Sequence, residues 1–189
     1  NWQKWSILIF LLSIIITLLV FVPKWGTTTL GAKRWIDLGI ISFQPSEFLK
    51  LGFVIYFASW LALKKETITR FKNGFLPGML IMAIPTIILL SQPDTGTLLS
   101  ILLAGLSMFF VAGGKWKHLL LLILLAIIGV SVIIYTKPYA LARITTFIDP
   151  LSDPLGAGYQ VRQALIAIGS GHFFGRGFGQ SIQKFNFLP

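Results

Sequence analysis

The chain has 189 residues, of which 55% are hydrophobic and only 12% are charged. A soluble domain of this size has too little interior to hide so much apolar surface, so the composition excludes a soluble globular protein and indicates an integral membrane protein. The net charge of +10 does not indicate nucleic acid binding, because no recognition motif accompanies it and basic residues commonly flank membrane spans.

Five apolar segments are long enough to cross a membrane, since a spanning helix needs about 20 mostly apolar residues. They are approximately residues 5–22, 46–63, 75–91, 96–112 and 119–136. The sequence therefore predicts an all-α, polytopic membrane helical bundle that forms one membrane domain over residues 1–189. Residues 137–189 are not expected to span, and we expect them to form a large extracytoplasmic loop that contains short helices.

Basic residues gather at one end of the predicted spans. This end holds Lys4, Lys64, Lys65, Arg70, Lys72, Lys115 and Lys117, in short loops. Short loops rich in lysine and arginine face the cytoplasm in most membrane proteins. We therefore expect the opposite end, with residues 23–45, 92–95 and 137–189, to face outward.

The first outward loop, residues 23–45, is too polar to span and contains Lys33-Arg34-Trp35. A tryptophan beside two cations suits the lipid headgroup region, so an interfacial anchor is one interpretation. The other interpretation is a phosphate clamp, in which Lys33 and Arg34 bind a lipid pyrophosphate.

The second predicted span begins at Pro45-Ser46-Glu47. We expect Ser46 to cap this helix and the Glu47 carboxylate to interact favourably with the helix dipole. Lys50 lies about one turn inside the apolar run, and its spacing from Glu47 allows the two to pair on one helix face. An ionisable residue within a span commonly faces a polar cavity, although Lys50 could also extend to the nearby interface.

Turn signals separate the later elements. Asp94 in Gln92-Pro93-Asp94 is expected to make a turn and cap the next span, and Asp149-Pro150 and Asp153-Pro154 are further turn signals. Residues 160–168 place apolar side chains at i, i+3, i+4 and i+7, which predicts a short amphipathic helix at the membrane surface or folded into the protein. Gly175-Arg176-Gly177-Phe178-Gly179 lacks the residues that close a P-loop, so we expect tight turns there.

Five blocks in order resemble the shape, elongation, division and sporulation (SEDS) family of FtsW-like and RodA-like proteins. These blocks are Lys33-Arg34-Trp35-Ile36-Asp37-Leu38-Gly39, Phe43-Gln44-Pro45-Ser46-Glu47-Phe48, Gln92-Pro93-Asp94-Thr95-Gly96-Thr97, Asp153-Pro154-Leu155-Gly156-Ala157-Gly158-Tyr159-Gln160 and Ile166-Ala167-Ile168-Gly169-Ser170-Gly171. The ending, residues 178–185, is closer to FtsW than to RodA. Family members are ten-span proteins of the bacterial cytoplasmic membrane, so the resemblance implies a fragment that holds the third to seventh spans. His172 stands where many relatives have glycine.

The resemblance implies a peptidoglycan glycosyltransferase that polymerises lipid II in cell division or elongation. Asp153 matches the family's essential loop aspartate and is therefore assigned as the general base. A divalent cation, Mg²⁺ or Mn²⁺, is compatible with the family, but its ligands are unknown. The residues assigned to substrate binding are Arg34, Lys50, Lys33, Glu47, Arg143 and Arg162, the last two only because they lie near Asp153 in the sequence.

The resemblance also implies partners, namely a class B penicillin-binding protein (a transpeptidase) and other divisome or elongasome proteins. Two other functions stay open. Lys50 within a span, together with Pro77 and Pro85 in another, also suits a lipid II flippase or transporter. A non-catalytic scaffold for the transpeptidase is the second alternative, in which Asp153 serves only a turn before Pro154.

Overall fold

The computed structural model describes residues 2–22, 26–29, 32–37, 39, 42–136, 141, 145–149 and 158–181. The chain divides into two compact units, Asn1–Leu124 and Leu125–Pro189. The polar network, the sheet and the packed core all belong to the first unit.

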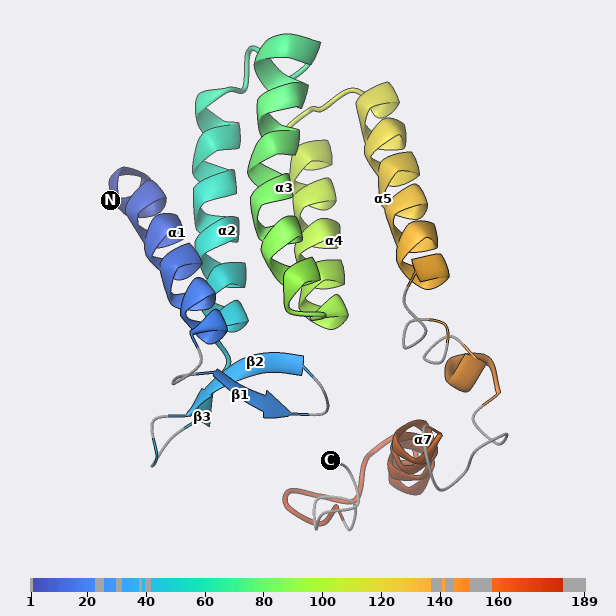
Figure 1. Cartoon of the computed structure of the whole chain (residues 1–189). Helices are drawn as coiled ribbons and strands as arrows, with labels where there is room; N and C mark the ends of the chain where they lie inside the picture. Colours follow the sequence, from blue (N-terminus) through green and yellow to red (C-terminus); the bar gives the residue numbers. More distant parts are fainter. Residues whose placement is uncertain are drawn as a thin grey trace. The chain divides into compact units, whose positions relative to one another are not determined.

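Long helices dominate the first unit (Figure 1). Helix α1 packs along α2, α2 also contacts α4, and α3 lies beside α4. This arrangement confirms the all-α helical-bundle fold class, and each predicted span overlaps one helix. The helices are α1 (Trp2–Leu18), α2 (Pro45–Leu63), α3 (Leu76–Ser91), α4 (Thr95–Val111) and α5 (Trp116–Thr136), which begins in this unit.

Three segments of the described chain are long and apolar enough to cross a membrane, namely Trp2–Phe21, Pro45–Leu63 and Phe71–Ser91. The apolar helices Thr95–Val111 and Trp116–Ser131 are shorter. Helix α4 has 17 residues and is therefore about 26 Å long, slightly less than a hydrocarbon core of about 30 Å. These helices support a membrane protein, while the crossing of the membrane by α4 and α5 stays a prediction.

A small antiparallel sheet, which the sequence patterns did not predict, fills the loop between α1 and α2. Its strands are β1 (Gly26–Thr29), β2 (Ala32–Asp37) and β3 (Ser42–Phe43), in the order β1-β2-β3. Threonine, tryptophan and isoleucine in β1 and β2 favour extended backbone. Ile36 in the central strand is only 2% exposed, so one face of the sheet packs against the protein.

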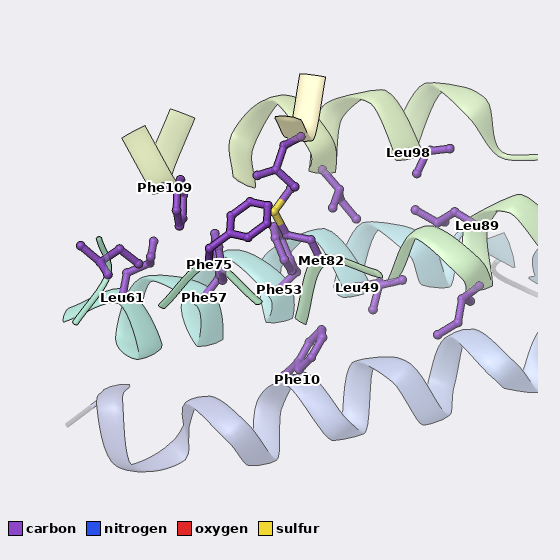
Figure 2. Packing of buried hydrophobic residues seen from close by; sticks show 14 residues of the cluster. Phe10, Leu49, Phe53, Phe57, Leu61, Phe75, Met82, Leu89, Leu98 and Phe109 are labelled. Carbon is purple, nitrogen blue, oxygen red and sulfur yellow. The ribbon is translucent and has the colours of Figure 1, made fainter. Parts of the chain in front are cut away.

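Aromatic side chains fill the core between the helices (Figure 2). Phe53 and Phe57 of α2 are completely buried and stack with their ring centroids 5.2 Å apart. Helix α4 approaches them closely at Gly105, where an added Cβ would lie 2.8 Å from Met82 Cε and 3.2 Å from Phe53 Cζ. Interlocking of this kind fixes the helices relative to one another, because close-packed cores tolerate little change in volume.

Helices α1 and α2 meet through small residues. An added Cβ at Gly52 would lie 2.4 Å from Ser13 Oγ and 3.3 Å from the Ile9 carbonyl oxygen. Small residues let membrane helices approach closely enough for their backbones to pack. A side chain in place of Gly52 would therefore push α1 and α2 apart.

The second unit contains α7 (Tyr159–Gly171), which confirms the helix predicted over residues 160–168. The predicted tight turns after it are also confirmed, because Gly175, Gly177 and Gly179 have φ values of 70°, 98° and 73°. His172 ends α7 with φ 48° and ψ −150°, a backbone conformation that favours glycine.

Candidate functional site

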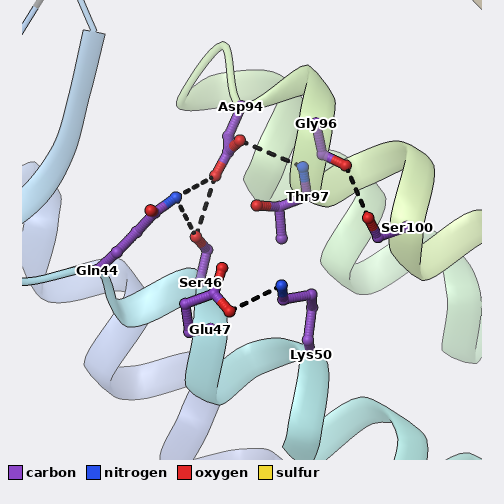
Figure 3. Close-up of polar contacts among 8 residues, drawn as sticks. All are labelled: Gln44, Ser46, Glu47, Lys50, Asp94, Gly96, Thr97 and Ser100. Carbon is purple, nitrogen blue, oxygen red and sulfur yellow. Dashed lines mark hydrogen bonds and ion pairs between the residues drawn. The ribbon is translucent and has the colours of Figure 1, made fainter. Parts of the chain in front are cut away.

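A buried carboxylate, Asp94, joins three elements at the end of the bundle where α2 and α4 begin (Figure 3). Its side chain is 4% exposed. Its Oδ2 accepts hydrogen bonds from Gln44 Nε2 at 2.9 Å and from Ser46 Oγ at 3.0 Å, while Oδ1 accepts from the Thr97 backbone N–H at 3.3 Å. Three donors satisfy a charge that would otherwise be costly to bury.

The predicted cap by Asp94 is confirmed, whereas the predicted cap by Ser46 is wrong. Asp94 precedes α4 and accepts from the Thr97 N–H, as an N-cap side chain does. Ser46 lies inside α2, whose N-cap residue is Gln44 and has no side-chain cap. The Ser46 hydroxyl instead donates to Asp94 and accepts from Gln44 Nε2 at 2.9 Å, because the α3–α4 turn brings a stronger acceptor within reach.

A buried amide, Gln92, links the same turn to α1. It is 2% exposed, and its Nε2 donates to the Thr17 carbonyl oxygen at 2.9 Å. The Thr17 hydroxyl in turn contacts the carbonyl oxygens of Ser13 at 2.6 Å and Pro45 at 3.3 Å. The ends of α1, α2, α3 and α4 are thus held together by side-chain hydrogen bonds, and composition gave no signal for this role of Gln92.

Arg34 reaches the turn from the sheet. In the pairing of β1 with β2, Thr27 faces Trp35 and Thr28 faces Lys33, so Arg34 is the extra residue of a β-bulge. Bulges redirect side chains and are common beside active sites. Arg34 Nη2 donates to the Pro93 carbonyl oxygen, which directs the guanidinium toward the Asp94 turn.

The Arg34 guanidinium keeps unused donor capacity. Its Nε is buried and has no hydrogen-bond partner among the described residues. A guanidinium carries five N–H donors that match the oxygens of phosphate. The protein therefore holds Arg34 through one donor and leaves its Nε donor unused among the described residues.

Glu47 and Lys50 form the predicted pair on α2. Lys50 Nζ lies 2.7 Å from Glu47 Oε2, and the two side chains are 33% and 55% exposed (Figure 3). Both follow Ser46 within the first two turns of α2, so the pair is at the same end of the bundle as Asp94. Lys50 adds a second cation there, and Glu47 holds it in place.

The remaining predicted site residues lie outside the described residues or in the second unit. Asp153 and Arg143 lie outside the described residues, as does the side chain of Lys33. Arg162 lies on the exposed side of α7, in the second unit. The structure therefore places Arg34, Glu47 and Lys50 together and adds Gln44, Ser46 and Asp94 to them.

The described residues do not fit the divalent cation that the family resemblance allows. No group of three or more His, Asp or Glu side chains comes together in the described part of the chain. The Asp94 oxygens already accept hydrogen bonds, and Asp37 Oδ1 accepts from the Gly39 N–H at 2.8 Å. A cation site stays a prediction without ligands.

A family model for FtsW, RodA and SpoVE, described as cell cycle proteins, matches residues 1–189. The chain belongs to this family. Two FtsW/RodA/SpoVE relatives cover all of the chain, one a "Probable peptidoglycan glycosyltransferase FtsW" from Geobacter sp. (strain M18) at 42% identity and the other "Stage V sporulation protein E" from Bacillus subtilis (strain 168) at 39%. The chain spans about half their length, 51% and 52%.

Solved structures of this family share the fold. One, described as "Structural coordination of polymerization and crosslinking by a peptidoglycan synthase complex", is 35% identical, matches 90% of this chain and 50% of its own, and gives a TM-score of 0.70. The rod shape determining protein RodA of Thermus thermophilus is 30% identical, matches 67% of this chain and 41% of its own, and gives a TM-score of 0.55.

Three of the SEDS-like blocks meet in space, although they are far apart in the sequence. The Arg34 contact with Pro93 joins residues 59 positions apart, and the Gln44 contact with Asp94 joins residues 50 apart. The blocks are carried by β2, the start of α2 and the turn between α3 and α4. In this FtsW/RodA/SpoVE chain, they form a polar network at one end of the bundle.

Proposed function

We propose that the full-length protein polymerises lipid II into peptidoglycan glycan strands at the outer face of the bacterial cytoplasmic membrane, as a multi-pass enzyme. The proposal is carried by the match to a relative named a probable peptidoglycan glycosyltransferase, at 42% identity over 188 residues. A solved relative described by polymerization and crosslinking in a peptidoglycan synthase complex supports the same activity.

In the proposed reaction, the C4 hydroxyl of an acceptor sugar attacks the anomeric carbon of the lipid-linked donor. A new C–O bond forms, and the bond to the pyrophosphate breaks, so the pyrophosphate leaves with the electron pair. The Asp153 carboxylate accepts the hydroxyl proton as general base. This role of Asp153 rests on its match to the family's loop aspartate.

Positive charge near the leaving pyrophosphate stabilises the negative charge that develops there. Arg34 suits this role because its guanidinium is held by the Pro93 carbonyl and its Nε is buried without a partner among the described residues. Lys50, oriented by Glu47, supplies a second cation. Lys33, Arg143 and Arg162 are further proposed contacts for the substrate.

The proposed partner is a class B penicillin-binding protein, whose transpeptidase links the strands that this protein makes. A solved relative described by the coordination of polymerization and crosslinking in a peptidoglycan synthase complex supports a partner of this kind. Further divisome or elongasome proteins belong to the same proposal.

The test follows labelled lipid II with the purified full-length protein, with and without Mg²⁺, and separates the products by length. Asp153→Asn should abolish glycan strands, and Arg34→Gln should lower the rate more than Arg34→Lys, because lysine keeps the charge but loses the planar donors. Asp149→Asn is the matched control in the same loop. Strands made by a well-folded Asp153→Asn protein would refute the base assignment, and strands lost only in Asp149→Asn would move it to Asp149.

The alternatives give different products. A flippase moves lipid II between the leaflets of a vesicle and makes no glycan. A scaffold also makes no glycan, and it still binds the transpeptidase when Asp153 is replaced by Asn. Lipid II transport or transpeptidase binding by a wild-type protein that makes no glycan would overturn the proposed activity.

A further inference from the structure

A groove lies between α2 and α4, at the end of these helices opposite to Asp94. Its volume is 440 Å³, which falls in the range of roughly 300–1,000 Å³ that ligand pockets occupy. The small side chains of Ala58, Ala62 and Ser107 leave the space, and Met108 and Val111 give it apolar walls. Lys65, the second residue after α2, is the charged residue of the lining.

The connecting segments at this end of the bundle are rich in positive charge. The segments that join α2 to α3 and α4 to α5, including the first turn of α5, carry Lys64, Lys65, Arg70, Lys72, Lys115 and Lys117 against one acidic residue, Glu66. Lys65 is exposed, and it forms no ion pair among the described residues. Basic pockets between membrane helices on the cytoplasmic side are typical binding sites for anionic lipid headgroups.

We propose that this groove binds an anionic phospholipid, with one acyl chain along the apolar walls and the phosphate against Lys65. An apolar lining requires an apolar occupant, and the cation at its mouth selects a negative headgroup. Another helix is the competing occupant, because Ala58 and Ala62 are spaced for close helix packing. A phosphate pairs with the Lys65 charge, whereas an apolar helix face offers it no partner, which favours the lipid. The site is far along α2 from the proposed catalytic end and does not depend on the proposed function.

The experiment uses the full-length protein in lipid nanodiscs. Two photoreactive lipids with the same acyl chains are compared, an anionic phosphatidylglycerol and a zwitterionic phosphatidylcholine, each with a diazirine in one chain. Mass spectrometry of the digested protein locates the labelled residues. We expect phosphatidylglycerol to label the α4 segment with Met108 and Val111 at least three-fold more than phosphatidylcholine, and the preference to fall at high salt.

Paired variants separate the groove from the general basic surface. Lys65→Gln should bring the ratio of the two lipids close to one, whereas Lys64→Gln, next to it but outside the lining, should keep the preference. Ala62→Trp should remove the label by filling the groove, and Leu63→Trp on the exposed neighbouring position should not. Equal labelling by both lipids in the wild-type protein, no labelling of α4, or an unchanged ratio in Lys65→Gln would each overturn the proposal. If Ala62→Trp fails to fold, the Lys65 and Lys64 pair still decides it.

Discussion

Ser46 Oγ donates to Asp94 Oδ2 at 3.0 Å, across 48 positions of the chain. This bond joins the first turn of α2 to the residue that caps α4, and Gln44 strengthens the same link. Since Pro93 in the same turn accepts from Arg34, the Asp94 network also fixes the carbonyl that orients the guanidinium. The relationship therefore connects the packing of the bundle with the cation assigned to the pyrophosphate.

Asp94→Asn should destabilise the protein. An amide has one oxygen, so it can accept either from Gln44 and Ser46 or from the Thr97 N–H, and its NH2 group meets the donors on the other side. At least one donor therefore loses its partner. We expect the free energy of unfolding to fall by about 1–3 kcal/mol. Thermal unfolding of the purified protein measures this change. Asp37→Asn is the control, because Asp37 is exposed and accepts from the Gly39 N–H, and it should leave the melting temperature almost unchanged.

A double-mutant cycle tests the Gln44 contact with Asp94 directly. Gln44→Glu alone places two carboxylates side by side and should also be destabilising. Combined with Asp94→Asn, Gln44→Glu again places one donor opposite one acceptor. The free energy of unfolding should therefore fall in the double variant by at least about 1 kcal/mol less than the sum of the two single losses. Additive losses would show that the two side chains do not interact.

Gly52→Ala should weaken the contact of α1 with α2. The new methyl group would overlap Ser13 Oγ, and the backbone of α1 limits how far it can move. We expect a loss of about 1–3 kcal/mol, as for other overpacked sites. Gly129→Ala on α5 is the matched control, because nothing lies within 4 Å of an added Cβ there, and it should be neutral or stabilising by up to about 1 kcal/mol. Equal losses in both variants would contradict the close contact.

His172→Gly should stabilise the end of α7. The backbone at φ 48° and ψ −150° strains any side chain that carries a Cβ, and glycine removes this strain. We expect a gain of about 1 kcal/mol, visible as slower proteolysis after α7. The control is Ser170→Gly, two residues earlier and inside the helix, which should lower the stability by about 1 kcal/mol instead. A loss in both variants would indicate that His172 is not strained.

The predicted orientation can be read by labelling, because the chain contains no cysteine of its own. Ser42→Cys on β3 and Glu66→Cys after α2 are both at exposed positions, at opposite ends of α2. An impermeant maleimide should label Ser42→Cys in intact cells and Glu66→Cys only in broken cells, since the basic loops are expected in the cytoplasm. The reverse pattern would place Arg34 and Lys50 on the cytoplasmic side and rule out their proposed role outside.

The helices and the local contacts could be predicted from the sequence. Long apolar runs located the helices, and short-range rules located the cap by Asp94, the pair of Glu47 with Lys50, and the amphipathic helix α7. Each of these depends on residues within one or two turns of one another. Spacing along the chain is sufficient information for such contacts.

The contacts between distant segments could not be predicted. Gln92 binds Thr17 across 75 positions, and the Thr17 hydroxyl reaches Pro45 across 28. Such partners depend on which helices are neighbours, and apolar patterns do not encode that order. The same reason explains the incorrect cap at Ser46, whose hydroxyl is taken by Asp94. The bulge at Arg34 was missed because its strands are short and the register of pairing shifts within them.

The helix ends are held together by hydrogen bonds from Gln44, Ser46, Gln92 and Thr17. These bonds determine how this end of the bundle responds to salt. All four are uncharged, and their bonds to one carboxylate and to backbone carbonyls are buried or partly buried, so these bonds do not depend on attraction between opposite surface charges. Attraction between opposite surface charges fades within about 10 Å at 0.1 M salt, while short contacts of buried neutral groups do not. When the salt concentration rises, these hydrogen bonds between the helix ends should therefore persist, while a more exposed ion pair such as Lys50 with Glu47 weakens.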